Sequence, residues 1–121
     1  MAAASSPSWE GRARAGRDLA AFAEVPEVAE ALVRLLLDAE DTAVTRRTAE
    51  ALARAGSVAA VRALARAVAG ADDGQADWLE TGVLDAEAPD LAAACAALAR
   101  DREEAVRRGA AEVMVWVGDR S

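Results

Sequence analysis

The sequence contains no histidine and only one cysteine, Cys95. Without histidine, neither a Ser-His-Asp triad nor a histidine-based metal site can form, and a lone cysteine cannot make an intrachain disulfide. We therefore expect no cofactor and no metal. Cys95 lies in an alanine-rich run, which is typical of a small residue buried in a core.

Long apolar runs are also missing. No run approaches the roughly 18 residues that a membrane-spanning helix needs. Residues 1–23 lack the uninterrupted apolar core of a secretory signal. These absences predict a soluble, cytoplasmic protein that does not bind membranes.

Aromatic residues make up only 3% of the chain, although 54% of it is hydrophobic. The difference is largely alanine, at 35 of 121 residues, and isoleucine and tyrosine are absent. A chain rich in alanine and poor in β-branched and aromatic residues favours helix over strand. Its length suits one domain or a short repeat array.

Negative charge is confined to one region of the sequence. The net charge is −7, yet residues 1–66 carry nine arginines and nine acids, and residues 100–121 carry five of each. Residues 67–99 carry seven acids and no base. A field of this sign repels phosphate backbones, so we expect no nucleic-acid binding through this region.

An internal repeat of about 31 residues is visible in the acidic pairs Glu40-Asp41, Asp72-Asp73 and Glu103-Glu104. Each pair follows one apolar helical stretch and precedes another, at steps of 32 and 31 residues. A period of this length is typical of stacked helical hairpins. The acids are best explained as residues at helix N-termini, where the helix dipole favours negative charge.

Apolar periodicity and capping residues predict seven helices, with Ser6 as a cap of the first, Asp41 as the cap of the third, and Gly56 and Gly118 as stops. The predicted fold class is all-α, a short right-handed solenoid of antiparallel helix pairs with about three and a half repeats in one domain, 1–121. The expected helices are 7–23, 26–37, 42–55, 58–68, 75–86, 89–100 and 103–117. The expected units are a capping helix, 7–23, and the repeats 26–56, 57–87 and 89–118.

The last predicted helix carries a recognisable motif. An acidic turn is followed by Val106-Arg107, then Ala110-Ala111, a hydrophobic pair and Gly118. This pattern resembles the second half of a HEAT repeat, in the short bacterial type that includes the PBS-lyase-like repeats. The resemblance implies a protein-binding scaffold. In the equivalent stretch before Gly56 the arginine is displaced by one place, to Arg46, so its usual pairing between repeats is an open question.

Two tryptophans replace polar residues of the repeat. Trp116 falls at the position of Arg54, and Trp78 falls close to that of Arg46 or Arg47. Each is either a binding residue on an outward face or a filler of gaps between helices. The sequence leaves both interpretations open.

Charged residues are further candidates for a binding surface. Arg46, Arg47, Arg107 and Arg108 form either a solvated inter-repeat face or a ridge for an acidic partner. Asp72, Asp73 and Asp77 of the acidic central third are candidates for contact with a partner. They come closest to a calcium loop, but the twelfth position from Asp72 is not an acid, so we expect no calcium there.

The C-terminal helix ends in five consecutive apolar residues, from Val113 to Val117. Five positions at 100° each cannot all face one core, so we expect some to be exposed. This edge is a candidate interface for a partner or for a second copy of the chain.

These patterns together predict a non-catalytic scaffold that binds another protein through its second-helix face and its apolar C-terminal edge. The acidic central third makes a basic partner one option. The alternatives are an enzyme or nucleic-acid-modifying module, and an assembly or immunity protein that masks a basic partner.

Overall fold

The computed structural model describes residues 2–118. Its seven α-helices confirm the predicted all-α class, and no strand occurs within the described range. Short 3-10 segments cover Ala2–Ser5 and Ala20–Phe22. The α-helices are α1 (Trp9–Leu19), α2 (Pro26–Leu36), α3 (Thr42–Ala55), α4 (Val58–Gly70), α5 (Asp73–Ala86), α6 (Leu91–Leu98) and α7 (Glu104–Gly118).

The start of α1 differs from the prediction. Its N-cap is Ser8, whose side chain accepts a hydrogen bond from the Gly11 N–H at 3.1 Å. The predicted cap, Ser6, instead accepts the N–H of Ser8 at 3.3 Å, so it shapes the turn before the helix. The helix therefore begins at Trp9 rather than at residue 7.

Caps elsewhere follow the expected chemistry. Asp41 accepts from the Ala43 N–H at 2.8 Å, and Gly56 ends α3 with a φ of 66°. Asp72 and Gln75 form a reciprocal capping box, so α5 begins two residues earlier than predicted. Such caps satisfy backbone N–H groups that have no partner inside the helix.

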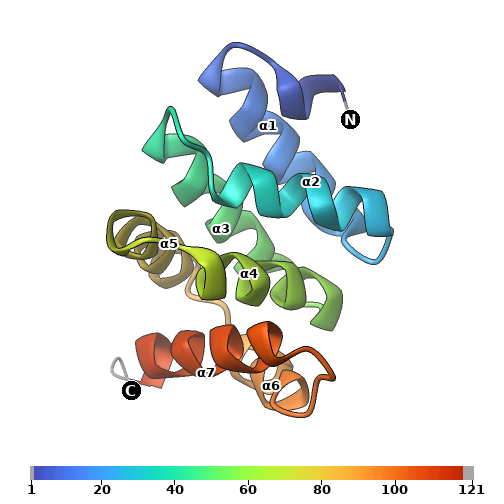
Figure 1. Ribbon diagram of the computed structural model, residues 1–121, viewed down its shortest axis with the longest axis vertical. Helices are drawn as coiled ribbons and strands as arrows, with labels where there is room; N and C mark the ends of the chain where they lie inside the picture. The colour runs from blue at the N-terminus through green and yellow to red at the C-terminus, as the bar shows by residue number, and fades with distance from the viewer. Residues whose placement is uncertain (1, 119–121) are drawn as a thin grey trace.

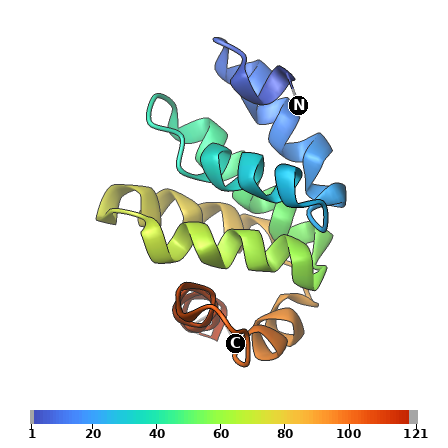
Figure 2. The ribbon, with the colours of Figure 1, turned by 45° about the vertical axis from the view of Figure 1, so that its right-hand side comes forward.

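The helices stack in two layers along the long axis of the molecule (Figures 1 and 2). In one layer α1 packs on α3 and α3 packs on α5, and we call this the second-helix layer. The other holds α2 and α4, and α7 packs mainly on α4, with only slight contact to α5. The repeat pattern classes α7 with α3 and α5, but the structure does not place it in their layer.

A glycine explains where α7 lies. A Cβ on Gly109 would overlap the backbone of Ala65, so only glycine lets α7 approach α4 this closely. Gly82 does the same on α5, where a Cβ would overlap the backbone of Arg46 on α3. Both contacts bring two adjacent helices together through backbone rather than through large side chains.

One main core runs through both layers and includes Cys95. Its large side chains are mostly leucine and valine, and many are fully buried. A smaller cluster of Ala13, Ala15, Leu35 and Val44 joins α1 to α2 and α3.

Candidate protein-binding surface

A groove of about 750 Å³ lies between α1 and α3 in the second-helix layer. Alanines contribute much of its lining, together with the glutamates Glu10 and Glu50. The groove is basic, because five arginines outnumber these two acids. The five are Arg14, Arg17, Arg46, Arg47 and Arg54.

Helical spacing places these arginines along the groove. On α1, Arg14 and Arg17 are three residues apart, and on α3, Arg47 and Arg54 are seven apart. Residues at these steps lie on one face of a helix. Two facing stripes of guanidinium groups therefore border one channel.

The arginines differ in what they already contact. The Arg46 Nη1 lies 3.6 Å from Asp85 Oδ2 on α5, and the Arg54 Nη2 lies 3.3 Å from Glu50 Oε2. The guanidinium of Arg47 stacks over the ring of Trp9, with 5.2 Å between Cζ and the ring centroid. This cation–π contact joins α1 to α3.

Arg14 and Arg17 are exposed and form no ion pair within residues 2–118. Neither residue was predicted from the sequence as part of a binding surface. A signal was present in their three-residue spacing, but the groove arises only when α1 packs against α3.

The neighbouring helix, α5, presents the opposite charge. Asp72, Asp73 and Asp77 are exposed and make no ion pair in the described part of the chain. Asp72 is committed to capping, since its Oδ1 accepts from the Gln75 N–H at 2.7 Å. The second-helix layer is thus basic over α1 and α3 and acidic along α5.

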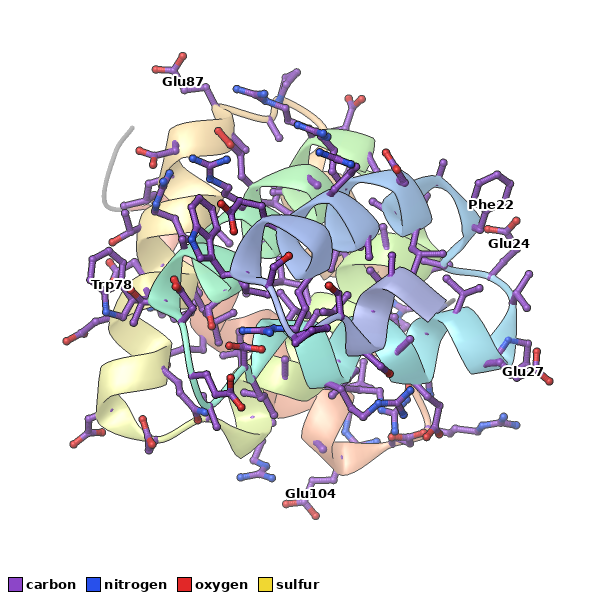
Figure 3. All side chains as sticks on the ribbon, turned by 90° about the horizontal axis from the view of Figure 1, so that it is seen from above. Phe22, Glu24, Glu27, Trp78, Glu87 and Glu104 are labelled. Atoms are coloured by element: carbon purple, nitrogen blue, oxygen red, sulfur yellow. The ribbon has the colours of Figure 1, made fainter. Side chains whose placement is uncertain are left out.

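Trp78 lies on this acidic helix with 40% of its surface exposed. Figure 3 shows it projecting from the side of the molecule opposite to Phe22. Tryptophan is enriched among the residues that contribute most of the binding energy at protein interfaces. Of the two tryptophans that the sequence left undecided, Trp78 is therefore on the surface.

Trp116, unlike Trp78, is buried. It is only 6% exposed and belongs to the main core, as does the fully buried Val113. The packing of α7 on α4 turns these two side chains inward, which favours the core interpretation. Val117 is half-buried, and the members of the apolar run that face outward are Met114 and Val115, at 39% and 56% exposed.

The four arginines of the predicted ridge lie in two pairs, on two different helices. Arg107 donates from Nη1 to the Asp101 carbonyl oxygen at 2.6 Å, and Arg108 lies 3.7 Å from Glu104. Both are on α7, whereas Arg46 and Arg47 line the groove on α3. The structure does not gather the four into one ridge.

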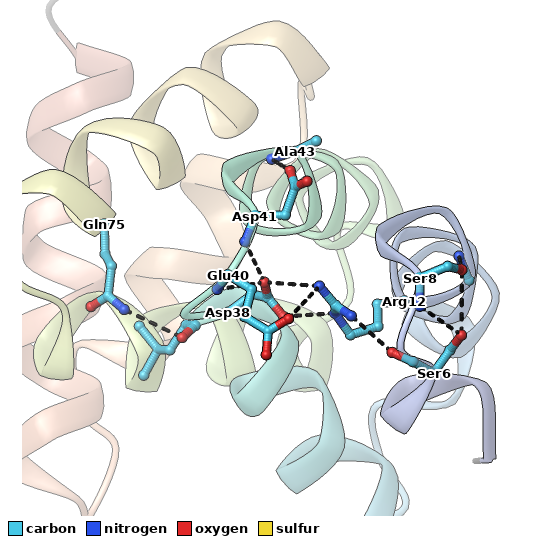
Figure 4. Close-up of polar contacts among 10 residues, drawn as sticks. Ser6, Ser8, Arg12, Asp38, Glu40, Asp41, Ala43 and Gln75 are labelled. Carbon is cyan, nitrogen blue, oxygen red and sulfur yellow. Dashed lines mark hydrogen bonds and ion pairs between the residues drawn. The ribbon is translucent and has the colours of Figure 1, made fainter.

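The turn that precedes α3 is held from both neighbouring helices of its layer, α1 and α5 (Figure 4). Arg12 on α1 donates from Nε to Asp38 Oδ1 at 2.9 Å, and Gln75 donates to the Leu37 carbonyl oxygen at 3.3 Å. Arg12 was not among the predicted residues, although the recurrence of Asp-x-Glu at Asp38 and Asp101 marks the turns.

The turn before α7 repeats this arrangement. Arg62 on α4 lies 3.1 Å from Asp101 and 2.8 Å from Glu103. The hydrogen bond from Arg62 lowers the pKa of Asp101, and the same bond raises the pKa of Arg62. These contacts stabilise the stack rather than form a reactive site.

Cys95 is buried, and burial raises its pKa to about 11. A thiol with such a pKa is almost entirely protonated near neutral pH and is a poor nucleophile. Across residues 2–118 no cluster of acids and cysteine is arranged to hold a metal ion. Among the described helices, none is long and apolar enough to cross a membrane.

Comparison with known proteins gives one match. A family model described as HEAT repeats matches residues 1–81. No match was found among curated proteins or among solved structures.

Proposed function

The chain belongs to the HEAT-repeat family, and on that premise we propose that it is a non-catalytic scaffold that binds another protein through its second-helix layer. HEAT repeats generally mediate contacts between proteins. The observation that carries the proposal is the exposure of Trp78 on the acidic helix α5, in the same layer as the basic groove between α1 and α3. This layer combines an aromatic anchor with charges of both signs.

The chemistry of α5 favours a partner with a basic segment. Asp73 and Asp77 lie one turn apart on α5, are exposed and have no ion pair within residues 2–118, so a cationic side chain meets uncompensated carboxylates there. Complementary charge mainly accelerates association and selects partners, while a desolvated tryptophan supplies affinity. Masking of a basic surface by α5 is one form of this function.

The test compares two exposed aromatic residues. Wild-type protein, Trp78→Ala and Phe22→Ala are immobilised, and captured proteins from the native host are quantified by mass spectrometry. Phe22 is the matched control, because it is 55% exposed but lies away from α5. We expect a protein that wild type and Phe22→Ala retain and Trp78→Ala loses, and its purified form then gives a dissociation constant by calorimetry.

A double variant, Asp73→Asn/Asp77→Asn, tests the contribution of the α5 carboxylates to binding. These changes remove two charges without touching the Asp72 cap. We expect slower association with the purified partner and weaker salt dependence. A partner that binds all variants equally contradicts the assignment to α5.

We also propose that the exposed edge of α7 is covered by a second copy of the chain. Met114 and Val115 are 39% and 56% exposed there. Burial of both in a symmetric contact removes apolar surface from water on each side. Self-association then depends on Val115 and not on Trp78.

A further inference from the structure

We propose that the groove between α1 and α3 binds an acidic peptide segment of a partner protein, with carboxylates held by Arg14, Arg17 and Arg47. This inference rests on the proposed protein-binding function and names the chemistry of a second contact on the same layer. The groove is separate from the Trp78 face of α5, so the two contacts are tested independently.

The three arginines are the groove cations that no carboxylate neutralises within residues 2–118. Arg14 and Arg17 are exposed, and Arg47 is held by its contact with the Trp9 ring. A guanidinium group binds a carboxylate through two parallel hydrogen bonds. Because stacking on Trp9 restrains Arg47, its side chain loses less freedom when a carboxylate binds.

The lining favours separate carboxylates over a continuous chain of phosphates. Glu10 and Glu50 interrupt the arginines, and Asp85 stands beside Arg46 at the border with α5. A nucleic acid carries a negatively charged phosphate at every nucleotide, so these three acids would repel it. A peptide places carboxylates only opposite the free arginines.

The floor of the groove suits a peptide backbone. Ala13, Ala20 and Ala51 contribute small side chains, which let a ligand approach the helices closely. From Arg46 to Arg54, eight steps of about 1.5 Å give a channel of roughly 12 Å along α3. That length accommodates about two turns of a bound helix, whose same-face acids recur every three or four residues.

The probe is a twelve-residue, helix-forming peptide with glutamates on one face and alanines elsewhere. It is titrated into isotopically labelled protein while nuclear magnetic resonance follows the backbone and arginine Nε–H signals, which detects weak binding and locates it. We expect the largest shifts on α1 and α3. In Arg14→Gln/Arg17→Gln we expect about tenfold weaker binding.

The matched control is Arg34→Gln/Arg100→Gln, which removes the same charge from exposed sites outside the groove. It should retain affinity within about twofold of wild type. Equal weakening in both double variants overturns the proposal, because bulk charge then explains binding. Absence of shifts on α1 and α3 overturns it as well.

Two further outcomes assign the groove to another occupant and so overturn the proposal. One is tighter binding of a single-stranded oligothymidylate with the same dependence on Arg14 and Arg17. The other is self-association of wild type that the groove variants abolish. If a protein partner depends on Trp78 and the acidic peptide does not bind, only the groove proposal fails.

Discussion

Arg62 on α4 and Asp101 in the turn before α7 form a two-point contact, with Nε 3.1 Å from Oδ1 and Nη2 3.4 Å from Oδ2. Arg12 on α1 and Asp38 in the turn before α3 form the same contact at 2.9 and 3.4 Å. In each turn the aspartate also accepts the N–H of the glutamate two residues on. Both arginines therefore order the turn that starts a neighbouring helix.

The Asp101 contact predicts a specific dependence of stability on pH. The pKa of Asp101 is lowered by the hydrogen bond from Arg62, so its ionised form stabilises the folded state above the unfolded pKa of about 4. That contribution is lost as the pH falls through the lower, folded pKa. Arg62 stays charged throughout, because its own pKa is raised.

Urea unfolding of wild type and Asp101→Asn at pH 7, 5 and 3 measures this effect. We expect Asp101→Asn to be less stable at pH 7 and the gap to narrow towards pH 3. Glu112→Gln, an exposed neutralisation on α7, should follow the wild-type profile. A gap that stays constant with pH contradicts the role of the Asp101 charge.

The Arg12–Asp38 pair predicts a strong thermodynamic coupling. The two side chains are only 10% and 11% exposed, so removal of one leaves a charge that water reaches poorly. We expect Arg12→Leu or Asp38→Leu to cost about 3–5 kcal/mol of unfolding free energy. The double variant should cost less than the sum, by about 1–3 kcal/mol, in a denaturation cycle.

The exposed pair Glu50–Arg54 is the control for this cycle, since Arg54 is 62% exposed. Its coupling should stay below about 1 kcal/mol. Similar coupling in both cycles would mean that burial adds nothing to the Arg12–Asp38 contact.

Gly109 predicts a large effect from one added methyl group. In Gly109→Ala the new Cβ overlaps the backbone of Ala65, so α7 must move away from α4. We expect a loss of about 1–3 kcal/mol or more in thermal or chemical unfolding. Gly70→Ala adds the same group in open space at the end of α4, where alanine favours the helix, and should leave stability unchanged or raise it by up to about 1 kcal/mol.

Local chemistry explains why much of the fold is predictable. Asp41 and Ser57 are in favourable cap positions, and Gly56 supplies the positive φ that ends α3. Such signals depend on neighbours in sequence, so helix number and approximate bounds follow from them. The predicted start of α1 was wrong because Ser6 and Ser8 are equally good N-cap residues, and only the geometry of the turn selects Ser8.

Contacts between helices explain what could not be predicted. The layer that α7 joins depends on how closely Gly109 approaches Ala65, which no periodicity encodes. The basic groove likewise exists only once Arg14 and Arg17 on α1 stand opposite Arg47 on α3. Acidic residues on α5 were easier to foresee, because they cluster in the sequence itself.

The C-terminal helix supplies the last prediction, which separates a core residue from a surface residue one position away. Trp116 is 6% exposed, so Trp116→Arg buries an unpaired charge and should unfold the α7 end of the stack. Trp116→Ala should cost about 3–5 kcal/mol. Val115 is 56% exposed, so Val115→Arg should leave helicity and melting temperature nearly unchanged.

Light scattering then tests the exposed edge of α7. If a second copy covers this edge, wild type should associate as its concentration rises, and Val115→Arg should remain monomeric, because the arginine places charge in an apolar contact. Arg108→Gln, another exposed change on α7, is the control and should associate like wild type. If the wild-type protein stays monomeric at millimolar concentration, the proposal that a second copy covers α7 is wrong. An unstable Trp116→Arg variant would still identify Trp116 as a core residue.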